Sequence, residues 1–186
     1  MRHIIFSCCL LMLVGCSRMR ARKELQRLSQ IEICIPADLE VYCEGRSVDT
    51  LTDGHIGAIK QIIYYDSTGC SSCQINHLAM TESLFTQDST GRFTPILLFA
   101  PSRGQYDSEV FKRACVSVSG FYRPENEFIR RNDPILADTR FQSFLLDRNN
   151  RIVLIGNPLN GDAMWNLFKS TLENMLAHDG EYVPEN

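Results

Sequence analysis

The sequence predicts an α/β fold built on a mixed central sheet, and three features lead to that prediction. Two apolar runs rich in β-branched and aromatic residues, Ile59–Tyr65 and Pro95–Phe99, are separated by a helical pattern that begins near Ser71, as in a strand–helix–strand crossover. A hairpin is expected next, with strands over Phe141–Leu146 and Arg151–Ile155. An amphipathic pattern then predicts a closing helix.

Turn-forming residues set the boundaries of these elements. Asp66–Gly69 follows the first strand, and Asp88–Gly91 ends the first helix. Asp147–Asn150 predicts the hairpin turn, and Asn160 is expected to cap the final helix. The weaker expected elements are strands over Ile31–Ile35, Glu40–Tyr42 and Val116–Tyr122 and short helices over 108–115 and 124–131.

Two cysteines lie at the junction between the first strand and its helix, in the order Cys70-Ser71-Ser72-Cys73. A helix N-terminus offers unpaired backbone N–H groups and a positive dipole end, which stabilise a thiolate. Cys70 is therefore the candidate nucleophile, and Cys73 is the candidate resolving cysteine one helical turn further on. Ser71 and Ser72 would supply backbone N–H groups, and Gly69 would allow close approach of a partner's backbone.

The beginning of the chain predicts export and a lipid anchor. The apolar run Ile4–Val14 is too short to span a bilayer and has the length of a signal-peptide core. It ends in Leu13-Val14-Gly15-Cys16, which resembles the lipobox of bacterial lipoproteins. The resemblance implies that residues 1–15 are a signal peptide and that Cys16 carries the lipid. An ordinary secretory signal with a chance cysteine is the alternative.

Residues 16–30 are expected to form the lipid anchor and a basic tether. The cations of Arg18-Met19-Arg20-Ala21-Arg22-Lys23 could lie against anionic headgroups or remain solvated. Ser17 is not the acidic residue that is linked to inner-membrane retention in lipoproteins. This resemblance favours an outer-membrane protein that faces the periplasm.

Composition predicts one compact domain, over residues 31–178, followed by a flexible tail over 179–186. A hydrophobic fraction of 44% is ample for a core, and the formal net charge is −3. Because Arg and Lys cluster in the tether, nothing indicates nucleic-acid binding by the domain.

Other cysteines have structural interpretations. Disulfides persist in exported proteins. Cys34 and Cys43 flank a short segment and could close it with a structural disulfide, or they could remain free thiols in the core. Cys115 is expected to be a core residue on a helix.

The chain resembles the thioredoxin-like family, and more closely its exported, membrane-tethered TlpA-like branch. The matching residues are Ile62–Tyr65 before Gly69–Cys73, and Ser143–Asp147 leading into Arg151–Val153. The resemblance implies a three-layer α/β/α sandwich and thiol–disulfide oxidoreductase activity. It implies envelope proteins with thiols or disulfides as partners, together with a redox donor, and it implies no cofactor.

Three positions depart from the family pattern. Gly69 stands where the family has a Trp or similar residue, and Tyr64 stands where it often has a buried acid or Asn, although Asp66 is a nearby carboxylate. Phe141 takes the place of the family's cis-proline, and the peptide bond before it is expected to be trans. The substrate groove beside that proline must therefore be built differently.

His77 follows Cys73 by one helical turn and could take up a proton, bind a metal as a third ligand, or be a half-exposed helix residue. No second Cys/His pair is evident, so no metal site is assigned. Three functions stay open: the oxidoreductase, a redox-inactive binding or assembly lipoprotein with a static Cys70–Cys73 disulfide, and a metal-handling protein.

Overall fold

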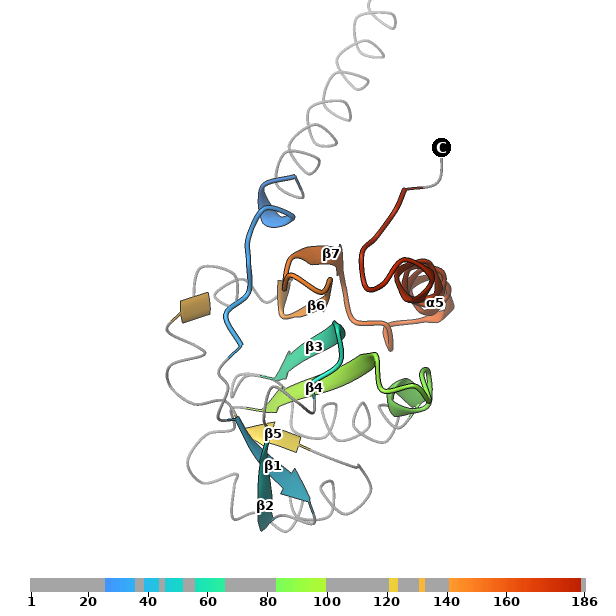
Figure 1. Ribbon diagram of the computed structural model, residues 1–186. Helices are drawn as coiled ribbons and strands as arrows, with labels where there is room; N and C mark the ends of the chain where they lie inside the picture. The colour runs from blue at the N-terminus through green and yellow to red at the C-terminus, as the bar shows by residue number, and fades with distance from the viewer. Residues whose placement is uncertain are drawn as a thin grey trace, which may run out of the picture.

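The computed structural model describes residues 26–35, 39–43, 46–51, 56–65, 83–99, 121–123, 131–132 and 141–184. Its strands form one sheet in the order β2-β1-β5-β4-β3-β6-β7, shown in Figure 1. The elements are β1 (Leu39–Cys43), β2 (Arg46–Leu51), β3 (Ile59–Tyr65), β4 (Phe93–Phe99), β5 (Phe121–Arg123), β6 (Ser143–Leu146), β7 (Ile152–Ile155) and helix α5 (Asp162–Ala177).

Strand directions make the sheet mixed. β3 runs parallel to β4, and β4 runs parallel to β5. β6 pairs antiparallel with both β3 and β7. The β3 residue Ile62 therefore sits between Ile96 of β4 and Phe144 of β6. The predicted α/β fold with a mixed central sheet is confirmed, and the order β4-β3-β6-β7 followed by α5 is that of a thioredoxin-like sandwich.

Both faces of β3, β4 and β6 are buried, as expected for interior strands of a sheet with parallel pairs. On one face, Ile59 and Ile63 pack with Leu145 and with Phe168 and Met175 of α5. Figure 1 shows α5 lying along that side of the hairpin strands. The opposite face carries a second cluster, whose buried members are Leu28, Ile33, Ile62, Tyr64, Ile96, Leu98, Phe144, Leu146 and Ile152.

The segment before β1 helps to cover this second face. Leu28, at 2% exposure, lies within the range that the sequence assigns to the tether, so the packed part of the chain begins before residue 31. The backbone N–H of Ile33 donates to the carbonyl of Asn150 at 2.9 Å. Glu32 forms an isolated antiparallel bridge with Arg151. The edge strand expected over Ile31–Ile35 is thus reduced to a single bridge.

Several boundaries differ from the prediction. β4 begins at Phe93, two residues early, and β2 was not predicted. β5 overlaps the expected strand only at its end. The prediction that Asn160 caps α5 was wrong, because Gly161 occupies the N-cap with a φ of 122° and no side-chain cap bond. Close packing of α5 through Phe168, Leu172 and Met175 holds the helix instead.

The chain after α5 is anchored along the part of the predicted tail that the structure describes. Asn174 clamps the backbone of Val183, donating from Nδ2 to its carbonyl and accepting from its N–H, both at 2.9 Å. Gly180 donates to the carbonyl of Met175 at 2.8 Å and accepts from the N–H of Arg148 at 3.0 Å. These bonds hold the segment after α5 against α5 itself and, through Arg148, against the hairpin turn.

The turn before β4 is organised by one carboxylate. Asp88 accepts from the hydroxyl of Thr90 at 2.6 Å and from the backbone N–H groups of Arg92 and Phe93 at 2.7 and 3.0 Å. Partial burial tends to raise the pKa of Asp88, but these hydrogen bonds outweigh it and hold the pKa below its ordinary value. The predicted helix stop at this position is confirmed.

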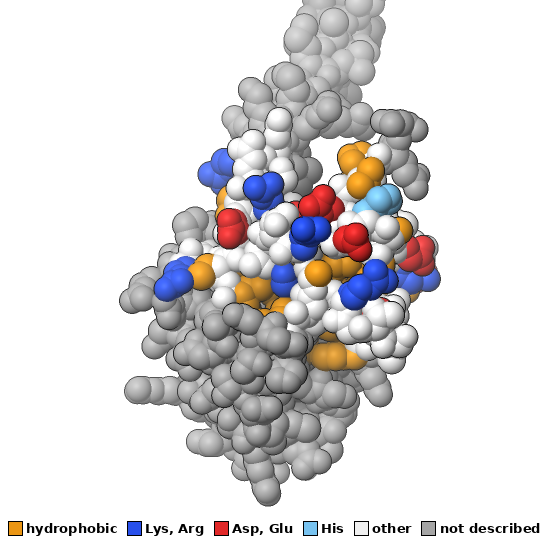
Figure 2. All heavy atoms as spheres, in the orientation of Figure 1, with side chains coloured by type: hydrophobic (Ala, Val, Ile, Leu, Met, Phe, Trp, Pro, Cys, Tyr) orange, Lys and Arg blue, Asp and Glu red, His pale blue; other side chains and the backbone are white. Residues whose placement is uncertain are grey.

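The surface of the described part carries charges of both signs. Figure 2 shows Lys and Arg side chains interspersed with Asp and Glu side chains over the visible described face. Nε of Arg148 lies 3.6 Å from Oε1 of Glu181, and both side chains are about half exposed. Over the residues that the structure describes, no helix has the length and apolar character needed to cross a bilayer.

Candidate functional site

The candidate redox site follows β3, an interior strand of the sheet. β3 has hydrogen-bonded neighbours along both edges, β4 on one side and β6 on the other. The strand ends at Tyr65, five residues before Cys70. Most predicted site residues lie outside the described residues, and their roles stay predictions: Cys16, Asp66, Gly69, Cys70, Ser71, Ser72, Cys73 and His77.

Two predicted supporting residues, Tyr64 and Phe141, are brought together near the end of β3. Tyr64 is buried, at 9% exposure, within the cluster against which Phe141 packs. The N–H of Tyr64 donates to the carbonyl of Gln142 at 2.7 Å, which continues the β3–β6 ladder by one residue. The chain that enters β6 therefore passes directly beside the end of β3. Phe141 contributes apolar packing where the family pattern has a proline.

The peptide bond before Phe141 starts at Arg140, outside the described residues, so its predicted trans form stays a prediction. No cis peptide occurs within the described part of the chain.

Cys34 is a free cysteine, and its surroundings were not predicted. Its Sγ accepts a hydrogen bond from Nη1 of Arg131 at 3.0 Å. Asn132 makes two hydrogen bonds to the backbone of Cys34. Its Oδ1 accepts from the Cys34 N–H at 3.2 Å, and its Nδ2 donates to the Cys34 carbonyl at 2.8 Å. The structural disulfide with Cys43 that the sequence left open is not formed, because Cys34 is held against a segment almost 100 residues further along the chain. No local sequence signal indicates such a long-range contact.

Gln61 forms a buried polar link between β3 and β6. Its Nε2 donates to Oγ of Ser143 and to the carbonyl of Ile62, both at 3.0 Å. Ser143 in turn donates to the carbonyl of Gly156 at 3.1 Å. Oε1 of Gln61 is buried and has no hydrogen-bond partner. This link fastens the strand that leads to the cysteine pair to the start of the hairpin.

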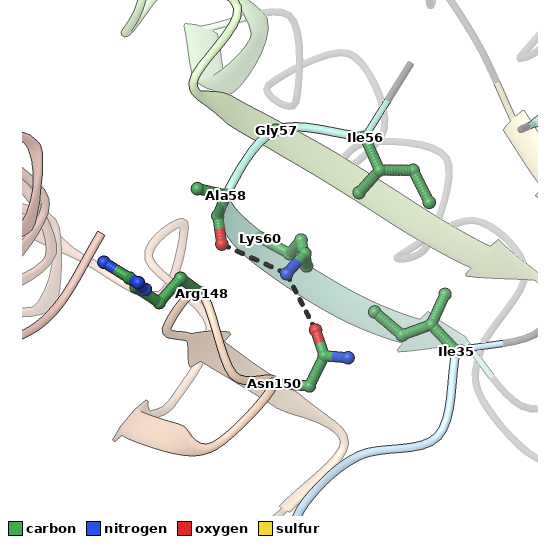
Figure 3. Close-up of a pocket in the computed structure, with 7 residues that line it drawn as sticks. All are labelled: Ile35, Ile56, Gly57, Ala58, Lys60, Arg148 and Asn150. Atoms are coloured by element: carbon green, nitrogen blue, oxygen red, sulfur yellow. Dashed lines mark hydrogen bonds between the residues drawn. The ribbon is translucent and has the colours of Figure 1, made fainter. Parts of the chain in front are cut away.

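Lys60 is the other polar residue that β3 buries, at 7% exposure. Its Nζ donates to the carbonyl of Ala58 at 3.0 Å and to Oδ1 of Asn150 at 2.7 Å (Figure 3). Burial lowers the pKa of the Lys60 ammonium, and the negative charge of Asp147 offsets this only in part. Strand alternation places Lys60 on the same face as buried Ile62 and Tyr64, so the two-residue period was the signal that could have identified this buried charge.

Lys60 lines a pocket of about 270 Å³ at the amino end of β3. Ile35 and Ile56 form an aliphatic side of it, and Arg148 and Asn150 of the hairpin turn form the other. Because the cysteine pair follows the carboxyl end of the same strand, this pocket belongs to the other end of the sheet.

The described residues hold no cluster of three or more His, Cys, Asp or Glu side chains that could bind a metal ion. The cluster considered in the sequence, Cys70, Cys73 and His77, lies outside them.

No protein-family model and no curated protein matches the chain. Three solved structures with similar folds are the thioredoxin domain of a thiol-disulfide oxidoreductase from Bacteroides vulgatus, a thioredoxin-family thiol:disulfide interchange protein from Chlorobium tepidum and a thioredoxin from Wuchereria bancrofti. Their sequence identities are 19%, 14% and 8%, and their TM-scores are 0.49, 0.47 and 0.49. The matches cover 75%, 78% and 75% of this chain and 96%, 96% and 97% of those chains. The activities in these names are those of the proteins that bear them.

Proposed function

We propose that this protein is a lipid-anchored thiol–disulfide oxidoreductase of the bacterial cell envelope, with Cys70 and Cys73 as its redox pair. The observation that carries the proposal is the position of β3. This strand is locked between β4 and β6, and Tyr65 ends it five residues before Cys70. A rigid strand that leads into a Cys-x-x-Cys helix start suits dithiol chemistry, because the first sulfur then has a defined position at a helix N-terminus.

The proposed reaction is a pair of thiol–disulfide exchanges. The Cys70 thiolate attacks one sulfur of a substrate disulfide, forms a mixed disulfide and releases the other substrate sulfur as a thiolate. The Cys73 thiolate then attacks the Cys70 sulfur, which releases the second substrate thiolate and leaves a Cys70–Cys73 disulfide. The substrate gains two electrons and the pair loses two. An envelope dithiol donor would reduce the pair again, and with an oxidising partner the same steps run in reverse.

Redox titration of the full chain tests this proposal. We expect dithiothreitol to reduce the Cys70–Cys73 pair while the protein remains folded, and alkylation followed by mass spectrometry to report the change at those two residues. Cys73→Ser should trap mixed disulfides with envelope proteins, because no thiol remains to resolve them. Cys70→Ser should trap none and should lower disulfide reduction to the rate of the buffer thiol alone.

Cys34→Ser is the matched control, since Cys34 is a free thiol held by Arg131 and should not affect the exchange. If the pair resists reduction in the folded protein, or if Cys73→Ser traps no partner, the oxidoreductase proposal fails.

One observation favours a redox-inactive binding or assembly protein as the second candidate. Phe141 packs against the apolar cluster around Tyr64, at the place where the family has the proline that lines the substrate groove. In that case the Cys70–Cys73 disulfide is static, and the titration above would find it unreactive.

Attachment to the envelope through Cys16 is part of the proposal and rests on the lipobox resemblance. Labelling of cells with a tagged palmitate should mark the wild-type chain and fail to mark Cys16→Ala. A labelled Cys16→Ala protein would refute lipidation at this residue.

A further inference from the structure

We propose that the pocket at the amino end of β3 binds a small organic acid, with its carboxylate on Lys60 and a short aliphatic body against Ile35 and Ile56. The proposal is independent of the cysteine pair. At the usual rise of a strand, Lys60 lies about 13 Å from Tyr64, near the carboxyl end of β3.

The first argument is the buried ammonium itself. Lys60 is 7% exposed, and among the described residues no carboxylate oxygen comes within ion-pair distance of its Nζ. Asp147 is the nearby acid, but its Oδ1 accepts from the N–H groups of Asn149 and Arg151 within the hairpin turn, at 2.8 Å each. Buried cations are normally paired. Lys60 therefore presents a positive charge without a directly bound counter-ion.

The second argument is donor capacity. An ammonium group has three N–H donors, and the carbonyl of Ala58 and Oδ1 of Asn150 take two of them. Both partners are uncharged acceptors, so neither of them neutralises a positive charge on Lys60. One donor remains for a ligand oxygen on the side of the pocket that Lys60 lines.

The third argument is the shape and polarity of the walls. Figure 3 shows the side chains of Ile35 and Ile56 extending toward one another on one side of the pocket, while Lys60 and Asn150 meet on another. A volume of about 270 Å³ admits a molecule of a few carbon atoms. One buried cation matches one negative charge, and Ile35 and Ile56 offer the carbon body of an organic acid an apolar contact that inorganic phosphate could not use.

Arg148 adds a second cation at the rim. Its side chain is 49% exposed, and its contact with Glu181 is 3.6 Å long, so the ion pair contributes little. The guanidinium is directed away from Lys60 in Figure 3, and its positive charge favours the approach of anions to the pocket.

Calorimetric titration of the full chain with isobutyrate at constant ionic strength tests the proposal. We expect saturable binding with a dissociation constant on the order of 1 mM. Isobutyramide, which has the same shape without the charge, should bind at least about tenfold more weakly. Inorganic phosphate should also bind more weakly than isobutyrate.

Lys60→Met removes the ammonium and preserves most of the side-chain volume. It should weaken isobutyrate binding at least about tenfold, whereas Lys169→Met, on α5 and away from the pocket, should leave it unchanged. Equal binding of isobutyrate and isobutyramide to the wild-type chain, or tighter binding of phosphate, would overturn the proposal even if Lys60→Met failed to fold. Unchanged affinity in a folded Lys60→Met protein would overturn it as well.

Discussion

Phe168→Ala is expected to lower the free energy of unfolding by about 4 kcal/mol. Phe168 is completely buried and lies at the centre of the contact between α5 and the sheet. Its ring centroid is 5.8 Å from that of Phe93 on β4 and 5.7 Å from that of Trp165 one turn earlier. Truncation would remove both ring contacts and leave a cavity that neighbouring strands, fixed by their hydrogen bonds, cannot close. Urea denaturation of the full chain measures the loss.

The adjacent residue provides the control. Leu167 is 50% exposed, so Leu167→Ala should change the free energy of unfolding by no more than about 0.5 kcal/mol. Phe168→Leu, which keeps an apolar side chain, should cost about 1 kcal/mol and remains measurable if the alanine variant does not fold. Similar losses for Leu167→Ala and Phe168→Ala would show that α5 does not dock through the face described.

Gly57→Ala is expected to destabilise the protein by about 3 kcal/mol, for a steric reason. A methyl group at Gly57 would clash with the carbonyl oxygen of Arg92 and lie 2.8 Å from that of Gly91. Both are backbone atoms and cannot rotate away. The contact is close because the start of β3 is fastened to the start of β4, with the N–H of Gly57 donating to Oγ1 of Thr94 at 2.8 Å and that of Ile59 donating to the Arg92 carbonyl at 2.9 Å.

Gly91→Ala is the control that distinguishes the cost of this steric clash from the cost of an unfavourable backbone conformation. Gly91 has a φ of 76°, but an added methyl group there meets no atom within 4 Å. Its substitution should therefore cost only about 1 kcal/mol, which reflects the left-handed backbone. Thermal and urea unfolding of both variants give the comparison, and a Gly57→Ala protein as stable as Gly91→Ala would contradict the close approach of the two strands.

The central strands were predictable because their patterns are local. β3 coincides with the predicted strand Ile59–Tyr65, and the hairpin strands β6 and β7 lie within their predicted ranges. The turn Asp147–Asn150 carries its own chemistry, with Oδ1 of Asp147 binding two backbone N–H groups and Asn150 adopting a φ of 59°. Continuous apolar runs and turn residues are sufficient to locate such elements.

Contacts between distant segments were not predictable in the same way. Leu28 lies in the range that the sequence assigns to a tether, yet it is buried in the apolar cluster on the face of the sheet that carries Ile62 and Tyr64. Cys34 could have been paired with Cys43 by sequence spacing, but it is held by Arg131 and Asn132. Both contacts depend on which distant segments pack together in the folded protein, and the residues next to Leu28 or Cys34 in the sequence carry little information about that packing.

The sequence by itself determined the α/β class, the strand that precedes Cys70-x-x-Cys73, the hairpin and the closing helix, because periodicity and turn chemistry act over a few residues. Only the tertiary structure decided that Tyr64 and Phe141 share one apolar cluster and that the amino-terminal segment covers a face of the sheet. It also decided that Lys60 is buried beside a pocket. The stretch before β1 and the hairpin turn, which are far apart in the sequence, both line that pocket, and their meeting could not be predicted from the residues next to Lys60.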